Sequence, residues 1–199
     1  MKNEKFKNKF RISSVRATWH NYNAGIYFIT ICTQNREHFF GKIITDDNSE
    51  PKMILSKIGE YTQQQIQNVT NHYSYAEIPL WVVMPNHIHA IVIIRNSDID
   101  NVYDDHKNAI CCRDAINRVS TCGGITQINN PMIKNCLGTI VRGLKARISK
   151  YAKDHEISFA WQPRFHDHII RKTDDLNRIV TYIQNNVARW ESDEYHNLL

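Results

Sequence analysis

The residues of this chain best suited to chemistry are two histidines one residue apart, His87 and His89. They lie in the run from Met84 to Val92, whose other residues are mostly apolar and predict a buried β-strand. Because side chains alternate along a strand, both imidazoles should project from one face and come close enough to share a metal ion. The pair alone does not decide this, since two hydrogen-bonded histidines of an ordinary sheet are the alternative.

A predicted helix near the end of the chain offers polar groups that the two histidines lack. It starts at Thr173, a good helix-capping residue, and runs to about Trp190. Beside its apolar stripe, Tyr182, Asn186 and Arg189 follow one another at the spacing of a single helical face. Each of them alone is typical of a boundary or surface residue, so only their combination with the histidines suggests a site.

The remaining pattern predicts an α+β sandwich, with helices packed on a mainly antiparallel sheet. Strands are predicted at 25–33, 75–83, 87–95, 157–161 and 165–171, and helices at 56–71, 137–151 and 173–190. Residues 96–131 show no sustained periodicity and contain a Gly-Gly pair, which predicts a surface insertion. We therefore expect one domain over residues 1–199, with a basic N-terminal arm at 1–16.

The charge of the chain is uneven and favours a polyanionic partner. The formal net charge is +5, and residues 98–130 hold five aspartates against three basic residues, so the rest of the chain carries about +7. Neither a membrane span nor a signal peptide is recognisable, and we expect a cytoplasmic protein. Five cysteines fit reduced thiols, and the spacing of Cys111, Cys112 and Cys122 near His106 matches no common zinc module.

Taken together, these motifs resemble those of the HUH single-tyrosine transposases, and among them the REP-associated tyrosine transposases. The family marker His-hydrophobic-His appears here as His87-Ile88-His89. A tyrosine followed four positions later by a polar residue appears as Tyr182-Ile183-Gln184-Asn185-Asn186. Supporting stretches occur at 27–33, 140–145 and 161–171, so the resemblance covers about residues 10–190 apart from the insertion.

The resemblance implies a ferredoxin-like sandwich of the HUH endonuclease type that cleaves single-stranded DNA beside hairpins. Tyr182 would attack a phosphodiester, giving a covalent 5′-phosphotyrosine and a free 3′-hydroxyl that allow the strand to be rejoined. His87, His89 and Asn186 would hold a divalent ion, Mg²⁺ or Mn²⁺, and two histidines suit Mn²⁺ better. Insertion-sequence members often have glutamine at the position of Asn186, so the shorter amide must approach the metal more closely.

Basic and aromatic residues are candidates for DNA contacts that do not read sequence. The basic candidates are Arg142, Lys145, Arg147 and Lys150 on the predicted helix, with Arg11 and Arg16 in the arm. A solvated helix face is the alternative for the first four. Trp19, Tyr22 and Trp161 could stack on bases or belong to the core.

A second pair with the same spacing, His166 and His168, also lies in a predicted strand. The residue between them is the charged Asp167, which suits a buried strand less well than Ile88 does. The first pair is therefore the better candidate for the metal. His168 is a candidate for a supporting position near the metal or for a DNA contact.

Other functions remain open beside a transposase. A domesticated or inactive relative would bind hairpin DNA without moving it, and an unrelated metal-binding or RNA-binding protein would use Tyr182 only for packing. The family includes dimers that share active sites and REP-associated members that act as monomers. The Tyr-x-x-x-Asn pattern leans toward the monomers, with a homodimer as the alternative.

Overall fold

The computed structural model describes residues 5–6, 9–10, 20, 22–45, 50–95, 135–193 and 195–196. Its centre is a four-stranded antiparallel sheet in the order β6-β7-β3-β8. The bounds are Gly25–Cys32 for β3, Ala76–Val83 for β6, His87–Ile94 for β7 and His166–Ile170 for β8. The sheet therefore places β7 and β3 in the interior and leaves β6 and β8 at the edges.

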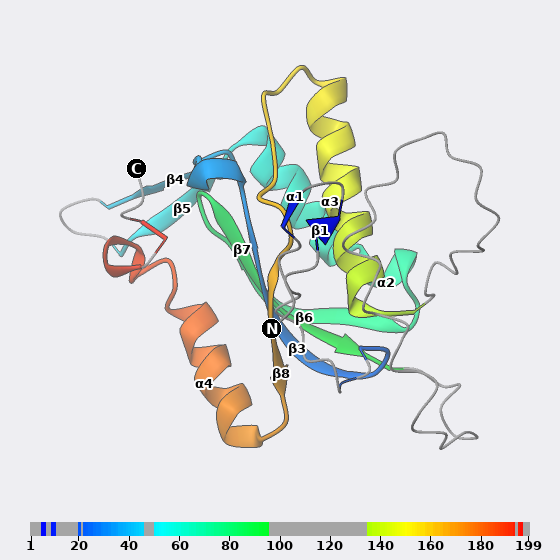
Figure 1. Cartoon of the computed structure of the whole chain (residues 1–199). Helices are drawn as coiled ribbons and strands as arrows, with labels where there is room; N and C mark the ends of the chain where they lie inside the picture. The colour runs from blue at the N-terminus through cyan, green and yellow to red at the C-terminus, as the bar shows by residue number, and fades with distance from the viewer. Residues whose placement is uncertain are drawn as a thin grey trace, which may run out of the picture.

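Helices cover both faces of this sheet (Figure 1). On one face lie α1, Lys57–Gln67, and α3, Leu137–Asp154, with the short α2, Val69–His72, after α1. On the other face lies α4, Thr173–Gln184. The chain order β3-α1-β6-β7-α3-β8 is that of a ferredoxin-like fold, to which α4 is added. The prediction of an α+β sandwich with a mainly antiparallel sheet is confirmed.

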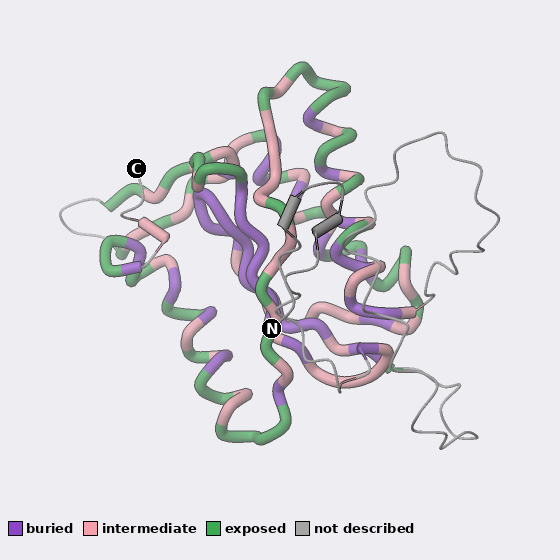
Figure 2. Tube along the Cα trace, in the orientation of Figure 1, coloured by how far each residue is buried: buried purple, intermediate pink, exposed green. Residues whose placement is uncertain are grey.

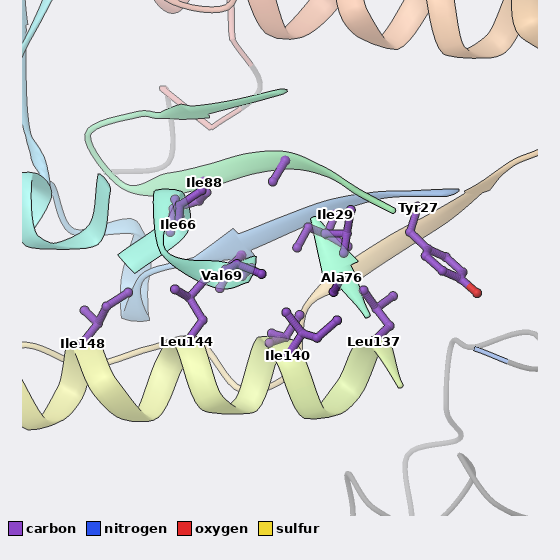
Figure 3. Packing of buried hydrophobic residues seen from close by; sticks show 14 of the residues in the cluster. Tyr27, Ile29, Ile66, Val69, Ala76, Ile88, Leu137, Ile140, Leu144 and Ile148 are labelled. Carbon is purple, nitrogen blue, oxygen red and sulfur yellow. The ribbon is translucent and has the colours of Figure 1, made fainter. Parts of the chain in front are cut away.

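The larger core lies between the sheet and α3 (Figure 3). Leu137, Ile140, Leu144 and Ile148 recur at helical spacing and point at the sheet, where they meet apolar side chains such as Ile88. The smaller core under α4 is formed by Ile91, Ile170, Ile179 and Ile183. Because β7 contributes to both cores, nearly all of its residues are buried (Figure 2).

Smaller elements flank the sheet. A hairpin of β4, Gly41–Ile44, and β5, Lys52–Leu55, follows β3. The first residue of β4 has to be glycine. Gly41 has φ 142°, and a Cβ there would lie 2.0 Å from the Ile54 carbonyl oxygen. Within the N-terminal arm, β1, Lys5–Phe6, pairs with β2, Lys9–Phe10. The insertion predicted at 96–131, with its three cysteines and His106, lies outside the described residues.

Three predicted elements differ from the structure. The helix predicted at 56–71 is divided at Asn68 into α1 and α2. Of the strand predicted at 157–161, only Trp161 pairs, in a single bridge to Thr33. The last helix ends at Gln184 instead of Trp190, and residues 190–192 form a separate 3₁₀ turn. Among the described residues, no helix is long and apolar enough to cross a membrane.

Candidate active site

The central strand β7 holds His87 and His89 on the face of the sheet that α4 covers. Their rings lie 4.5 Å apart between centroids, and the two residues are 0% and 1% exposed. The intervening Ile88 points into the opposite core. The alternation of the strand thus brings the two imidazoles together, as the sequence predicts.

His87 is held as a neutral imidazole with one bare nitrogen. Its Nδ1 donates to Asn86 Oδ1 over 2.8 Å, and the Asn86 amide is oriented by Nδ2, which donates to the Tyr195 carbonyl over 2.9 Å. The proton therefore sits on Nδ1, and the buried Nε2 has no hydrogen-bond partner among the described residues. Burial, followed by electrostatic interaction with His89 and with the Arg36 guanidinium, holds the pKa of His87 well below its usual value.

His89 is fixed by contacts on both ring nitrogens. Its Nδ1 lies 2.8 Å from Thr30 Oγ1 on the neighbouring strand β3, and its Nε2 lies 3.1 Å from the Tyr182 hydroxyl. Phe28 stacks on the ring at 5.2 Å. Burial lowers the pKa of His89 to about 3, so this imidazole is also neutral at physiological pH.

Tyr182 comes to this position from the last turn of α4. Ile179 and Ile183 pack against Ile91 on the sheet, and this packing turns the half-buried tyrosine toward β7. Its ring lies 5.1 Å from the ring of His89. In the tautomer whose Nδ1 donates to Thr30 Oγ1, Nε2 accepts from the Tyr182 hydroxyl.

Asn186 reaches the site by a route that the sequence does not predict. The expectation that Tyr182, Asn186 and Arg189 share a helical face is wrong, because α4 ends at Gln184. The following turn carries Asn186 inward to 1% exposure, while Arg189 is exposed. Asn186 Nδ2 donates to Asp193 Oδ2 over 3.2 Å, and its buried Oδ1 has no partner among the described residues.

These atoms fit a divalent metal ion. Two buried acceptors, His87 Nε2 and Asn186 Oδ1, lack hydrogen-bond partners in the described part of the chain. Burying such an atom costs free energy unless a hydrogen-bond donor or a metal ion binds it. The Asn186 side chain also lies near enough to His87 to raise its pKa, although the opposite effect of burial is larger. Within the described ranges, no group of three or more His, Cys, Asp or Glu converges, so the candidate set is two imidazoles and one amide.

The C-terminal turn covers the two histidines. The Tyr195 ring lies 4.6 Å from the ring of His87 and 5.9 Å from that of His89. The Arg36 guanidinium lies 3.9 Å from the Tyr195 ring centroid, and Asp193 Oδ1 accepts from the Tyr195 N–H over 2.7 Å. Sequence reasoning missed all three residues, and no local pattern could have found them because they meet the site only through the tertiary fold.

The second histidine pair lies at the edge of the sheet. His166 and His168 are exposed on β8, opposite Thr30 and Phe28. His168 Nε2 bonds to Asp175 Oδ2 over 2.5 Å. This bond connects β8 to the first turn of α4. Asp175, and neither His87 nor His89, is therefore the recorded side-chain partner of His168.

The basic residues of α3 do not form one solvent-facing row. Arg142 and Lys150 are exposed, the latter paired with Asp154 at 2.6 Å. Arg147 turns inward, where its Nε donates to Gln65 Oε1 over 2.8 Å. Arg11, Arg16 and Trp19 lie outside the described residues, and Tyr22 is a core residue, 2% exposed.

The ammonium of Lys145, which we expected to contact DNA phosphates, donates within the protein. Its Nζ donates to the carbonyls of Gln162 and Arg164 over 2.8 and 2.6 Å and lies 5.4 Å from the ring centroid of Trp161. Trp161 Nε1 returns a hydrogen bond to the Lys145 carbonyl over 3.2 Å. Burial lowers the pKa of Lys145 to about 8.

Comparison with known proteins finds relatives for both the sequence and the fold. No protein-family model matches the chain. It is 34% identical over 185 residues to an uncharacterized protein of Haemophilus influenzae, covering 92% of each chain. A solved structure of a REP-associated tyrosine transposase bound to a REP hairpin is similar at TM-score 0.52 and 19% identity, covering 94% of this chain and 76% of that one. A Deinococcus radiodurans structure, at TM-score 0.36 and 13% identity, is too distant to support an inference.

Proposed function

We propose that this chain, which belongs to the family of the Haemophilus influenzae protein and has a tyrosine transposase-like fold, is a metal-dependent single-stranded DNA endonuclease and strand transferase. The observation that carries the proposal is the Tyr182 hydroxyl 3.1 Å from His89 Nε2, beside two buried acceptor atoms without partners. Hairpin DNA is the proposed substrate class, since the structurally similar transposase is bound to a REP hairpin.

His87, His89 and Asn186 would hold the ion, Mg²⁺ or Mn²⁺. When bound, it would offset the charge of the scissile phosphate and make its phosphorus easier to attack. Asn86 and Thr30 fix the two rings through their Nδ1 atoms, so that each Nε2 is presented to the site. The short Asn186 side chain reaches the site because the turn after α4 brings its backbone inward.

Tyr182 is the proposed nucleophile. His89 Nε2 has one lone pair, so its use as a ligand would end its hydrogen bond with the Tyr182 hydroxyl, which could then face a phosphate. The tyrosine oxygen then forms a bond to phosphorus as the bond from phosphorus to the 3′-oxygen breaks. The phenol proton passes to solvent and the 3′-oxygen leaves as a hydroxyl, which gives a 5′-phosphotyrosine. Attack by a 3′-hydroxyl reverses the step and joins a strand.

A single chain is proposed to form the whole site. Tyr182 contacts the His89 of its own chain, and Asn186 follows on the same segment. A partner subunit is therefore not needed to supply the tyrosine. This arrangement favours action as a monomer over a homodimer with shared sites.

Binding of hairpin DNA without cleavage is a second candidate function. The observation in its favour is the Tyr195 ring, which packs over both His87 and His89. An enzyme with this site must move the C-terminal turn before a phosphate can enter. A binding protein has no such requirement.

A covalent-adduct assay separates the two functions. The full-length protein is incubated with Mn²⁺ and a panel of labelled single-stranded hairpin oligonucleotides, and products are resolved on a denaturing gel. We expect an adduct with the wild type and with Tyr61→Phe, a control on α1, and none with Tyr182→Phe. An adduct that persists in Tyr182→Phe would overturn the nucleophile, and binding without any wild-type adduct would favour the second function.

A further inference from the structure

A cavity at Arg36, whose charge acts on His87, is lined by residues that have no role in the proposed cleavage. Its volume is about 390 Å³, within the range of small-ligand sites. Its walls are Gln34, Asn35 and Arg36 on one side and Trp161, Gln162 and Pro163 on the other. An adjoining cavity of about 150 Å³ shares Gln162 and Pro163 and reaches Thr30, the partner of His89. Gln162 and Pro163 thus separate a cavity at Arg36 from one at Thr30, on the strand next to the histidines.

The two walls are held together by the backbone. The Gln34 N–H donates to the Ala160 carbonyl over 2.9 Å, and the Gln162 N–H donates to the Cys32 carbonyl over 3.0 Å. Lys145 fixes the far wall through its bonds to the Gln162 and Arg164 carbonyls. These bonds hold the two walls in place in the free protein, and the half-buried Lys145 ammonium stabilises one of them.

In the described part of the chain, Arg36 holds one buried donor atom without a partner near His87. The Tyr195 ring covers the face of its guanidinium at 3.9 Å, while the buried Nη1 has no partner among the described residues. A face that stacks on an aromatic ring and an edge that donates are the two ways in which arginine binds nucleic acid. A buried arginine donor without an acceptor points to an anionic oxygen as its missing partner.

We propose that Arg36 and this cavity form a subsite for the nucleotide that flanks the cleaved bond of single-stranded DNA. Arg36 binds the phosphate of that nucleotide, and its base enters the cavity against the wall that contains Trp161. The amides of Gln34 and Asn35 can both donate to and accept from a base edge. The proposal rests on the proposed function for its substrate class and adds where the strand runs beyond the tyrosine.

Arg36→Asn tests the phosphate contact. Asparagine tolerates the positive φ of 59° at this position, so the turn should survive. Full-length protein is titrated, in EDTA and over a range of NaCl, against a fluorescent single-stranded hairpin oligonucleotide. We expect about tenfold weaker binding and a salt dependence that is shallower by about 0.7, the value for one phosphate of a single strand.

Arg95→Gln is the matched control for that titration. Arg95 pairs with Glu77 beyond the opposite end of β7 from His87, and its side chain is 73% exposed. We expect its affinity to stay within about twofold of the wild type and its salt dependence to be unchanged. Equal salt dependence in Arg36→Asn and Arg95→Gln would overturn the phosphate contact.

Asn35→Gly tests the base contact without disturbing the turn. Asn35 has φ 52°, which glycine adopts freely, so the substitution removes only the amide. Abasic sites are placed at successive positions of the oligonucleotide. At one position next to the cleaved bond, we expect the abasic site to weaken binding of the wild type several-fold and that of Asn35→Gly hardly at all. Identical abasic penalties at every position in the two proteins would overturn the base contact.

The adduct assay keeps this proposal separate from the proposed function. If a Tyr182-dependent adduct forms while Arg36→Asn and Asn35→Gly bind like the wild type, the subsite is wrong and the cleavage function stands. If both variants show the expected losses while no hairpin gives an adduct, the subsite stands and the cleavage function is wrong.

Discussion

The two His-x-His pairs of this chain have the same spacing and opposite surroundings. His87 and His89 lie on the interior strand β7 and are buried, whereas His166 and His168 lie on the edge strand β8 and are exposed. Asn86 and Thr30 hold both Nδ1 atoms of the first pair, which leaves each Nε2 to the site. Spacing alone therefore does not make a candidate metal site, because the strand must also be placed where neighbours can orient the rings.

The largest expected difference between the pairs is in metal binding. His87→Ala and His89→Ala each remove a proposed ligand and should weaken Mn²⁺ binding by about 100-fold or more, beyond the usual effect of losing a supporting residue. His166→Ala should leave the affinity within about twofold of the wild type. Calorimetric titration of folded protein with Mn²⁺ checks this. Equal losses of affinity in variants of both pairs would contradict the assignment of the metal to His87 and His89.

The supporting residues should matter next. Asn86→Ala removes the acceptor that keeps the proton on Nδ1 of His87, and Thr30→Val does the same for His89. We expect each to weaken Mn²⁺ binding by about 10- to 100-fold while the protein still folds. Unchanged Mn²⁺ affinity in both variants would show that the hydrogen bonds on Nδ1 do not orient the two imidazoles for metal binding.

Burial should also make the first pair sensitive to acid. The folded pKa of His89 is about 3 and lies below the unfolded value of 6.5, so the unfolded state binds the proton first. The contribution of His89 to stability is therefore fully present above pH 6.5 and falls as the pH drops toward 3, by about 2 kcal/mol at pH 5. The lowered pKa of His87 adds a loss of the same sign. Urea unfolding at pH 7.5 and 5.0 in EDTA measures the sum. His89→Gln should remove the His89 share and keep that of His87, and an unchanged loss in this variant would contradict the prediction.

The smallest effect is expected at the second pair itself. His168→Gln breaks an ion pair with Asp175 that lies at the protein surface, where the His168 side chain is 52% exposed. Such pairs contribute little and are screened by salt. Thermal unfolding should show a slight loss of stability that disappears in high salt, with Mn²⁺ binding unaffected. A strong loss of Mn²⁺ binding would place His168 in the metal site after all.

The sequence predicts those parts of the site that depend on local periodicity. The alternation of β7 puts His87 and His89 on one face, and the apolar stripe of α4 turns Tyr182 toward the sheet. The family motif indicates Asn186 as a ligand, and this residue is buried beside His87. It does not share a helical face with Tyr182, because α4 ends before it. Nothing in the periodicity marks the end of α4 at Gln184.

The parts that could not be predicted depend on contacts between distant segments. Lys145 looks like a surface cation on the sequence, yet it donates to carbonyls 17 and 19 residues further along the chain. The strand predicted at 157–161 has suitable residues, but it forms only an isolated bridge, from Trp161 to Thr33 just after β3. Arg36 and Tyr195 reach the histidines from opposite ends of the chain, so no local pattern could place them there.

Mass spectrometry of the protein–DNA adduct tests the central claim most directly. The adduct formed with Mn²⁺ and hairpin DNA is digested with nuclease and protease, and the peptide that carries the remaining nucleotide is sequenced. We expect a phosphodiester bond on Tyr182, next to His89. A nucleotide on Tyr195, which lies over the same histidines, would contradict it.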